Sequence, residues 1–137
     1  MMKFRMAGIK VPQYAFLADS LSEGEIGFSV GMYFRYSVEG RRVACGVKCE
    51  FKSKEEKLLV SEVFCEFEIA TDDWNNAISG NMVTIPKGML EIFGTQTIGV
   101  VRGILYSKSE GGPGTGLILP PINVTELVNS DLTFELN

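Results

Sequence analysis

The chain has 137 residues, which is enough for one domain with its own apolar core and too few for several domains. Hydrophobic residues make up 45% of it and charged residues 22%, as in ordinary globular proteins. The 13 basic and 17 acidic residues give a net charge of -4, which argues against a nucleic-acid-binding protein but is compatible with a small basic patch.

The sequence shows no targeting or membrane segment. Lys3, Arg5 and Lys10 interrupt the apolar residues near the N-terminus, so no uninterrupted core of a signal peptide follows. The apolar stretch 88–106 contains Glu91 and Arg102, and a membrane span rarely holds two ionisable groups. We therefore expect a single domain over residues 1–137 that is cytoplasmic and does not insert into a membrane.

The first element is predicted to be a short strand over residues 4–11. Residues 11–25 then read as a connection, because Pro12 and Gly24 break any regular pattern. This connection contains Tyr14, Phe16 and Leu17, which is a large apolar content for a loop.

Three segments with strict alternation follow, over residues 26–38, 43–52 and 58–69. Period-two alternation predicts strands with one buried face, and their short connections predict antiparallel neighbours. In the second segment the inward residues are Val43, Cys45, Val47, Cys49 and Phe51. In the third, the outward face has Glu62, Glu66 and Glu68 but also Leu58, Val60 and Phe64.

A long helix is predicted over residues 86–108, after a short helical turn through Trp74 to Ile78. Pro86 suits the first turn, and apolar residues recur at helical spacing. Four glycines lie inside this helix, at positions 88, 94, 99 and 103, and each costs roughly 1 kcal/mol relative to alanine. We expect them to permit close packing of the helix, and the alternative is a kinked helix. A short helix or turn over residues 123–130 and a last strand over 132–136 complete the chain.

No residue pattern points to a catalytic or metal site. The chain has no histidine, and Cys45 and Cys49 would lie about 13 Å apart along one strand, too far for a disulfide. We expect Cys45, Cys49 and Cys65 to be buried, reduced thiols, and we expect no zinc or other cofactor. The glycine-rich loop 111–116 lacks the Gly-Lys-Ser/Thr of a phosphate-binding loop. We do not expect an enzyme, and one would have to use Glu66, Glu68, Asp72 or Asp73.

Three sequence features together resemble the SecB family of export chaperones. They are the strand ending Phe-Cys-Glu-Phe-Glu-Ile over residues 64–69, the helix segment 98–105 with Arg102, and the Leu-Pro-Pro-Ile-Asn-Val run over residues 119–124. The family has a similar acidic-apolar strand, a helix with an arginine ahead of apolar residues, and a Phe-Pro-Pro-Leu-Asn-Leu run. The resemblance spans about residues 26–128. This chain departs from the family in its longer glycine-rich insertion over residues 107–119 and in Gly99, where the family has proline.

The resemblance implies an α+β fold, with a four-stranded antiparallel sheet and one long helix plus one or two short helices packed on one face. It implies a homo-oligomer, a dimer of dimers, with Gly94, Gly99, Arg102 and Gly103 in helix packing. It also implies a chaperone that holds unfolded polypeptides, for export or for a dedicated client such as an antitoxin. The basic, metal-binding tail by which the family engages the SecA motor is absent before Asn137, so contact with such a motor is not expected.

Candidate client-binding residues follow from the exposure pattern and not from the family. They are Tyr14, Phe16, Leu17, Leu58, Val60, Phe64, Leu117, Ile118 and Ile122. The alternative for each is ordinary core or an oligomer interface. The alternative function is an oligomeric binding or structural protein with this fold and no general chaperone activity.

Overall fold

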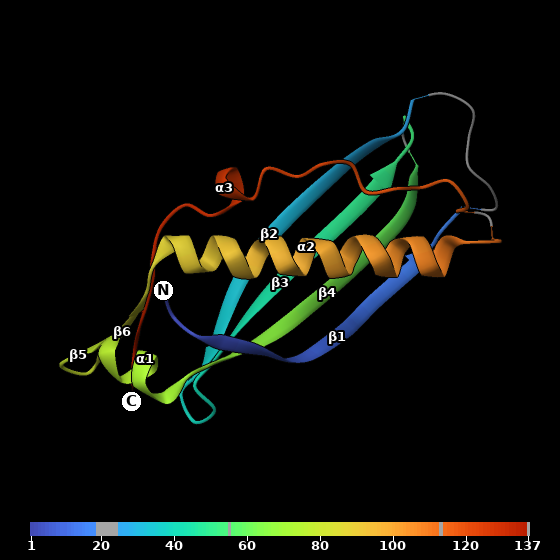
Figure 1. Ribbon diagram of the computed structural model, residues 1–137. Coiled ribbons are helices and arrows are strands. Elements are labelled where there is room, and N and C mark those ends of the chain that lie inside the picture. The colour runs from blue at the N-terminus through green and yellow to red at the C-terminus, as the bar shows by residue number, and fades with distance from the viewer. Residues whose placement is uncertain (19–24, 55, 113, 137) are drawn as a thin grey trace.

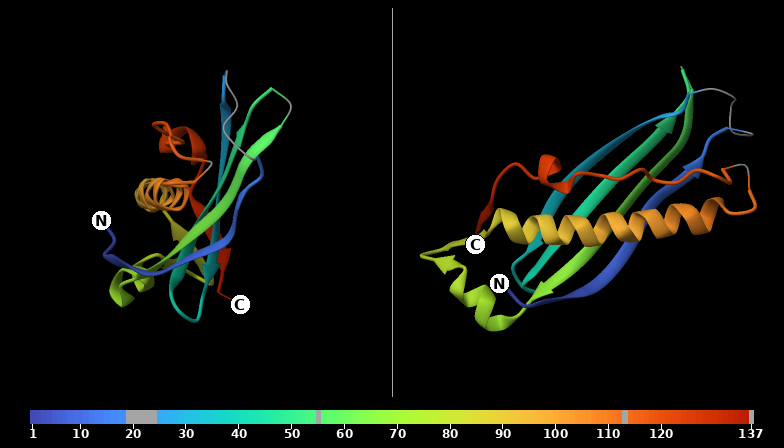
Figure 2. Two further views of the ribbon diagram at one scale, coloured as in Figure 1. Left: turned by 90° about the vertical axis from the view of Figure 1, so that its right-hand side faces the viewer. Right: turned by 45° about the horizontal axis from the view of Figure 1, so that its top comes forward.

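The computed structural model describes residues 1–18, 25–54, 56–112 and 114–136. Four long strands form one antiparallel sheet in the order β1-β4-β3-β2. Their bounds are Phe4–Phe16 for β1, Gly27–Ser37 for β2, Arg42–Lys52 for β3 and Lys57–Ile69 for β4. The long helix α2, Lys87–Ser109, crosses one face of this sheet, and none of the described helices lies over the other face, which we call the open face (Figures 1 and 2). The expected α+β architecture is therefore confirmed.

The three alternating segments form strands within one or two residues of their predicted bounds. Their register is continuous between β2 and β3, where Gly27 pairs with Lys52 and Ser37 with Arg42. The inward residues of β3 are all buried, as expected from alternation, and they face α2 together with the odd-numbered residues of β4. This layer between sheet and helix is the core.

Strand β1 corrects the sequence analysis. The predicted strand ended at Val11 and a connection followed, whereas β1 continues to Phe16 along the whole of β4. Its register shifts between Met6 and Gly8 and again between Lys10 and Gln13. These irregularities break the alternation that reveals a strand, and Pro12 is tolerated because it lies at such a shift on an edge strand.

The structure also contains a second, small sheet that the sequence did not predict. Its order is β5-β6-β7, from Ile78–Ser79, Met82–Ile85 and Leu132–Glu135. The strand expected over residues 132–136 is thus confirmed as β7, and its partner β6 precedes α2. Both short helices are present, α1 as Thr71–Asn76 and α3 as Val124–Leu127. The sheet extends beside α1 near the start of α2 (Figure 1).

After α2 the chain returns along the helix, over the same face of the large sheet (Figures 1 and 2). We call the segment 117–131 the return segment. Leu117, Leu119, Val124 and Val128 bury their side chains in the core, so it is an integral part of the helix layer.

Candidate functional site

The expected client-binding residues do not form one groove. Tyr14 and Phe16 pair with Ser61 and Leu59, on the helix side of the sheet. Val60 and Phe64 belong to the opposite, open face, where they pair with Ala15 and Lys10. Because paired residues in an antiparallel sheet point to the same face, the sheet itself separates the two groups.

Two of these residues are core residues of this chain. Leu58, expected on the outward face of its strand, is fully buried. The register moves directly from the Phe51–Leu59 pair to the Lys52–Lys57 pair, so Leu58 is an extra residue in a bulge and turns inward beside Leu59. Leu117, the first residue of the return segment, is also buried. Ile122 is half-buried, and Ile118 is 61% exposed.

Strand β1 presents the most continuous apolar surface among the expected positions. We define the β1 apolar edge as Ile9, Val11, Tyr14, Phe16 and Leu17. Ile9 is 50% exposed and Leu17 is 53% exposed, while Tyr14 and Phe16 are half-buried. The reason is positional: β1 is an outer strand, and α2 packs on the central strands β3 and β4. Sequence analysis missed Ile9 and Val11, and the only signal for them was the apolar content on both sides of Pro12.

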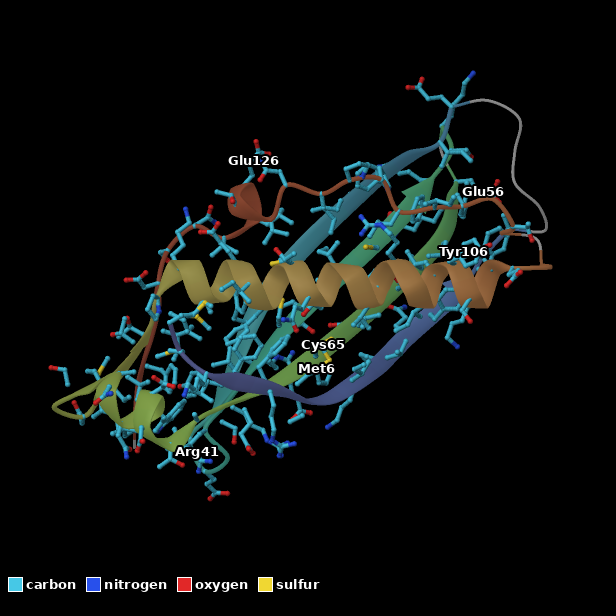
Figure 3. All side chains as sticks on the ribbon, in the orientation of Figure 1. Met6, Arg41, Glu56, Cys65, Tyr106 and Glu126 are labelled. Carbon is cyan, nitrogen blue, oxygen red and sulfur yellow. The ribbon has the colours of Figure 1, made fainter. Side chains whose placement is uncertain are left out.

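One end of the β1 apolar edge lies against the end of α2. The Lys108 ammonium is 5.3 Å from the centre of the Tyr14 ring, and partial burial raises the pKa of Tyr14 above its ordinary value. A Cβ atom placed on Gly114 would lie 3.0 Å from Cε2 of Phe16, so the glycine loop packs closely on that ring. Figure 3 shows Met6 on β1 and Tyr106 on this half of α2. The edge is therefore bordered by α2 and the loop, and within the described ranges its outer side has no neighbouring strand.

An apolar hollow of about 710 Å³ lies at the other end of α2. Its walls come from the N-terminus, α1, β6 and the first turns of α2, and include Met1, Met2, Ala77, Met89 and Ile92. Asp73 lines the hollow as its acidic residue, and its carboxylate accepts a 2.9 Å hydrogen bond from the backbone N–H of Lys3. The sequence analysis did not predict this hollow, because its walls come from segments that are far apart in the sequence.

The residues expected in helix packing have different roles. A Cβ atom on Gly94 would lie 2.8 Å from Cγ1 of Val124 and 2.9 Å from Sδ of Met32, so this glycine allows close packing within the chain. Gly99 and Gly103 instead face outward, with open space beside them. Arg102 ties α2 to the return segment, because its guanidinium donates hydrogen bonds of 3.3 and 3.2 Å to the carbonyl oxygens of Leu119 and Pro120.

Two of the four carboxylates considered for acid–base chemistry, Glu66 and Glu68, are held in ion pairs on the open face. Lys10 and Arg42 bind Glu66 at 3.1 and 3.0 Å, and Arg5 binds Glu68 at 3.0 Å. Hydrogen bonds from Lys10 and Arg5 keep the pKa values of Glu66 and Glu68 below the ordinary 4.5. Such carboxylates stay ionised at neutral pH and are poor proton donors.

The three cysteines are free and buried. Cys45 and Cys65 are direct partners on β3 and β4, and Figure 3 shows Cys65 close to the middle of α2. Burial raises the pKa of Cys45 to about 12 and that of Cys49 to about 11, so these thiols are poor nucleophiles. In the described ranges no cluster of histidine, cysteine and acidic side chains has the arrangement of a metal site. No described helix combines the length and apolar character needed to cross a membrane.

Comparisons with known proteins do not place the chain in a family. No model of a known protein family matches it, and neither does any curated protein. A solved structure described as a protein of unknown function from Streptococcus agalactiae aligns with 88% of this chain and 98% of its own, with a TM-score of 0.45 and 14% sequence identity. Similarity at this level supports no conclusion about fold or function.

Proposed function

We propose that the protein is a SecB-like holdase that binds non-native polypeptides along the β1 apolar edge. The observation behind this proposal is the combination, in β1, of exposed apolar side chains and an outer edge that pairs with no strand among the described residues. Native proteins usually protect such edges with charges, short strands or covering segments, because an exposed one recruits other chains. An edge strand of thirteen residues with this apolar surface is therefore a candidate site for binding other chains.

The proposed mechanism consists of binding alone and involves no catalytic step. An extended segment of a client can add to β1 as a further strand, so that backbone hydrogen bonds supply affinity for any sequence. Apolar client side chains on the helix side would contact Ile9, Tyr14 and Phe16, and burying one large side chain contributes about 1.5–3 kcal/mol. The apolar hollow near Met89 offers a second place for a client side chain.

The same proposal includes a cytoplasmic dimer of dimers. Its supporting observation is the outward side of α2, where Gly99 and Gly103 leave room for the backbone of a second helix to approach. A protein that used these surfaces only for assembly would be an oligomeric structural or binding protein, which is the second candidate function.

The test is suppression of aggregation. Light scattering of a reduced, unfolding client is followed with the protein added at rising ratios, and the mass of the protein is determined in the same buffer. We expect suppression near one oligomer per client. In the double variant Ile9→Ser, Leu17→Ser, both altered side chains are exposed, so we expect an intact fold and a several-fold higher ratio for half-suppression.

The matched control is Phe28→Ser, which removes an exposed aromatic side chain from the opposite edge strand, β2. Equal loss in the control and the double variant would contradict a specific role of β1. A folded oligomer that does not suppress aggregation at any ratio would reject the holdase and favour the structural alternative.

A further inference from the structure

The open face of the large sheet differs in charge from the rest of the molecule. Strands β1 to β4 contain seven lysines and arginines against four glutamates, a net charge of +3 in a chain whose total is -4. The remaining segments together therefore have a net charge of -7. Alternation places these strand charges on the face opposite α2, because the other face is the apolar core.

The outer layer of this face is basic, because its glutamates are recessed beneath longer side chains. The side chains of Glu66 and Glu68 are only 17% and 24% exposed, whereas those of their partners Lys10 and Arg5 are 64% and 65% exposed. Glu50 is bound by Lys57, and Glu62 accepts a hydrogen bond from the Tyr33 hydroxyl. All four carboxylates thus have partners, and the groups that meet an approaching molecule are ammonium and guanidinium groups.

Two further cations lie on the neighbouring strands β2 and β3. In the part of the chain that the structure describes, Arg35 and Lys48 form no ion pair. Their charged ends lie 5.2 and 5.9 Å from the centre of the Tyr33 ring. This ring covers Gly46 so closely that a Cβ atom there would lie 2.0 Å from Cζ of Tyr33. The result is a flat aromatic platform with a cation on either strand beside it.

A polar hollow of about 400 Å³ adjoins this platform. Its lining includes Lys48 and Lys57 together with Glu50 and Glu62, and the small residues Ser29 and Gly31 of β2 leave room above the sheet. Lys57 is paired with Glu50 at 3.7 Å, so among the described lining residues Lys48 is the cation that remains to bind an acidic side chain.

We propose that the open face is a docking surface for an acidic polypeptide segment of a partner protein. Charge complementarity selects this occupant: isolated carboxylates, about 6.6 Å apart on alternate residues of an extended segment, can each meet one of the separated cations. The four glutamates of this face add negative charge among those cations and disfavour the continuous row of phosphates in a nucleic acid. The surface is separate from the β1 apolar edge, so it does not depend on the holdase function.

The experiment measures binding of a fluorescent ten-residue peptide with glutamate at every second position, by anisotropy at two salt concentrations. We expect binding that weakens at least tenfold from 50 to 200 mM salt, and none by the same peptide with lysine in place of glutamate. The test variant is Arg35→Glu, Lys48→Glu. The control is Lys87→Glu, Lys108→Glu, which makes the same charge change on α2. We expect at least a tenfold loss for the test variant and less than a twofold change for the control.

Circular dichroism verifies that each variant is folded. If the charge-reversed test variant unfolds, the neutral variant Arg35→Gln, Lys48→Gln replaces it, and we expect that variant to lose less peptide affinity than the charge-reversed one. The proposal is overturned if the acidic peptide does not bind, if both charge-reversed variants lose binding equally, or if a ten-nucleotide oligothymidylate binds more tightly than the peptide. Aggregation suppression by the test variant should equal that of the original protein, so failure of one proposal is distinguishable from failure of the other.

Discussion

The helix side and the open side of the large sheet are built from the same four strands but are stabilised by different interactions. On the helix side, Val43, Cys45 and Val63 are fully buried, and close packing supplies the stabilisation. On the open side, Lys10, Arg42 and Glu66 form a surface network that water and salt screen. The difference predicts that changes of similar size will have unequal effects on the two sides.

The largest effect is expected from Phe67→Ala on the helix side. The Phe67 ring stacks on Phe93 at 4.4 Å between centroids and meets the edge of Phe4 at 5.8 Å. Removing it leaves a cavity among rigid neighbours and should lower the free energy of unfolding by about 3–5 kcal/mol. Urea denaturation measures this change, and a loss below about 1 kcal/mol would mean that the layer under α2 is loosely packed.

An intermediate effect is expected from alkaline pH, through the buried thiols. Their pKa values are about 12 for Cys45 and about 11 for Cys49, against 9.0 in an unfolded chain. A raised pKa contributes stability that is complete below pH 9 and is lost as the pH rises towards these values, because only the unfolded thiols ionise. At pH 10 the loss should be about 1.4 kcal/mol per thiol.

Denaturant unfolding at pH 8 and pH 10 would measure the change, with Cys45→Ala, Cys49→Ala as the reference. The loss should be much smaller in that variant, which retains Cys65. Equal losses in both proteins would assign the alkaline effect to other groups.

The smallest effect is expected from Glu66→Gln on the open side. The change breaks two ion pairs, yet the Lys10 and Arg42 side chains are 64% and 38% exposed, so the cost should be under about 1 kcal/mol. Because the pKa of Glu66 is lowered, its contribution is present above pH 4.5 and disappears as the pH falls through the folded value. Thermal unfolding should therefore separate the two proteins by more at pH 7 than at pH 3, and a loss as large as that of Phe67→Ala would refute the contrast between the faces.

The core strands and the long helix were predictable because each has one buried face and one solvent-exposed face. Cys49 and Phe51, for example, were assigned inward by alternation alone, and both are buried. Strand β1 was truncated because its bulges shift the alternation near Pro12, and β6 was missed because its partner β7 lies far along the chain. The alternation of apolar and polar residues within a segment does not indicate which distant strand it pairs with.

The candidate surfaces were less predictable than the fold. Exposure of Tyr14 depends on where α2 crosses the sheet, and the burial of Leu58 depends on one bulge. The basic character of the open face was hidden by the acidic total, and the strand assignments and the exposed fractions of Glu66 and Lys10 reveal it.

The pairing of β1 with β4 has a consequence for synthesis on the ribosome. Phe16 pairs with Leu59 and Phe4 with Ile69, so the first strand to emerge has no partner until the fourth is made. At elongation rates of about 5–20 residues per second this wait lasts roughly 3–10 seconds. The β2–β3–β4 meander has local contacts and can form as it emerges, whereas β1 must remain unpaired until β4 is available. During that interval the nascent chain displays its own apolar segment, and it has the same need for protection as the clients proposed for the finished protein.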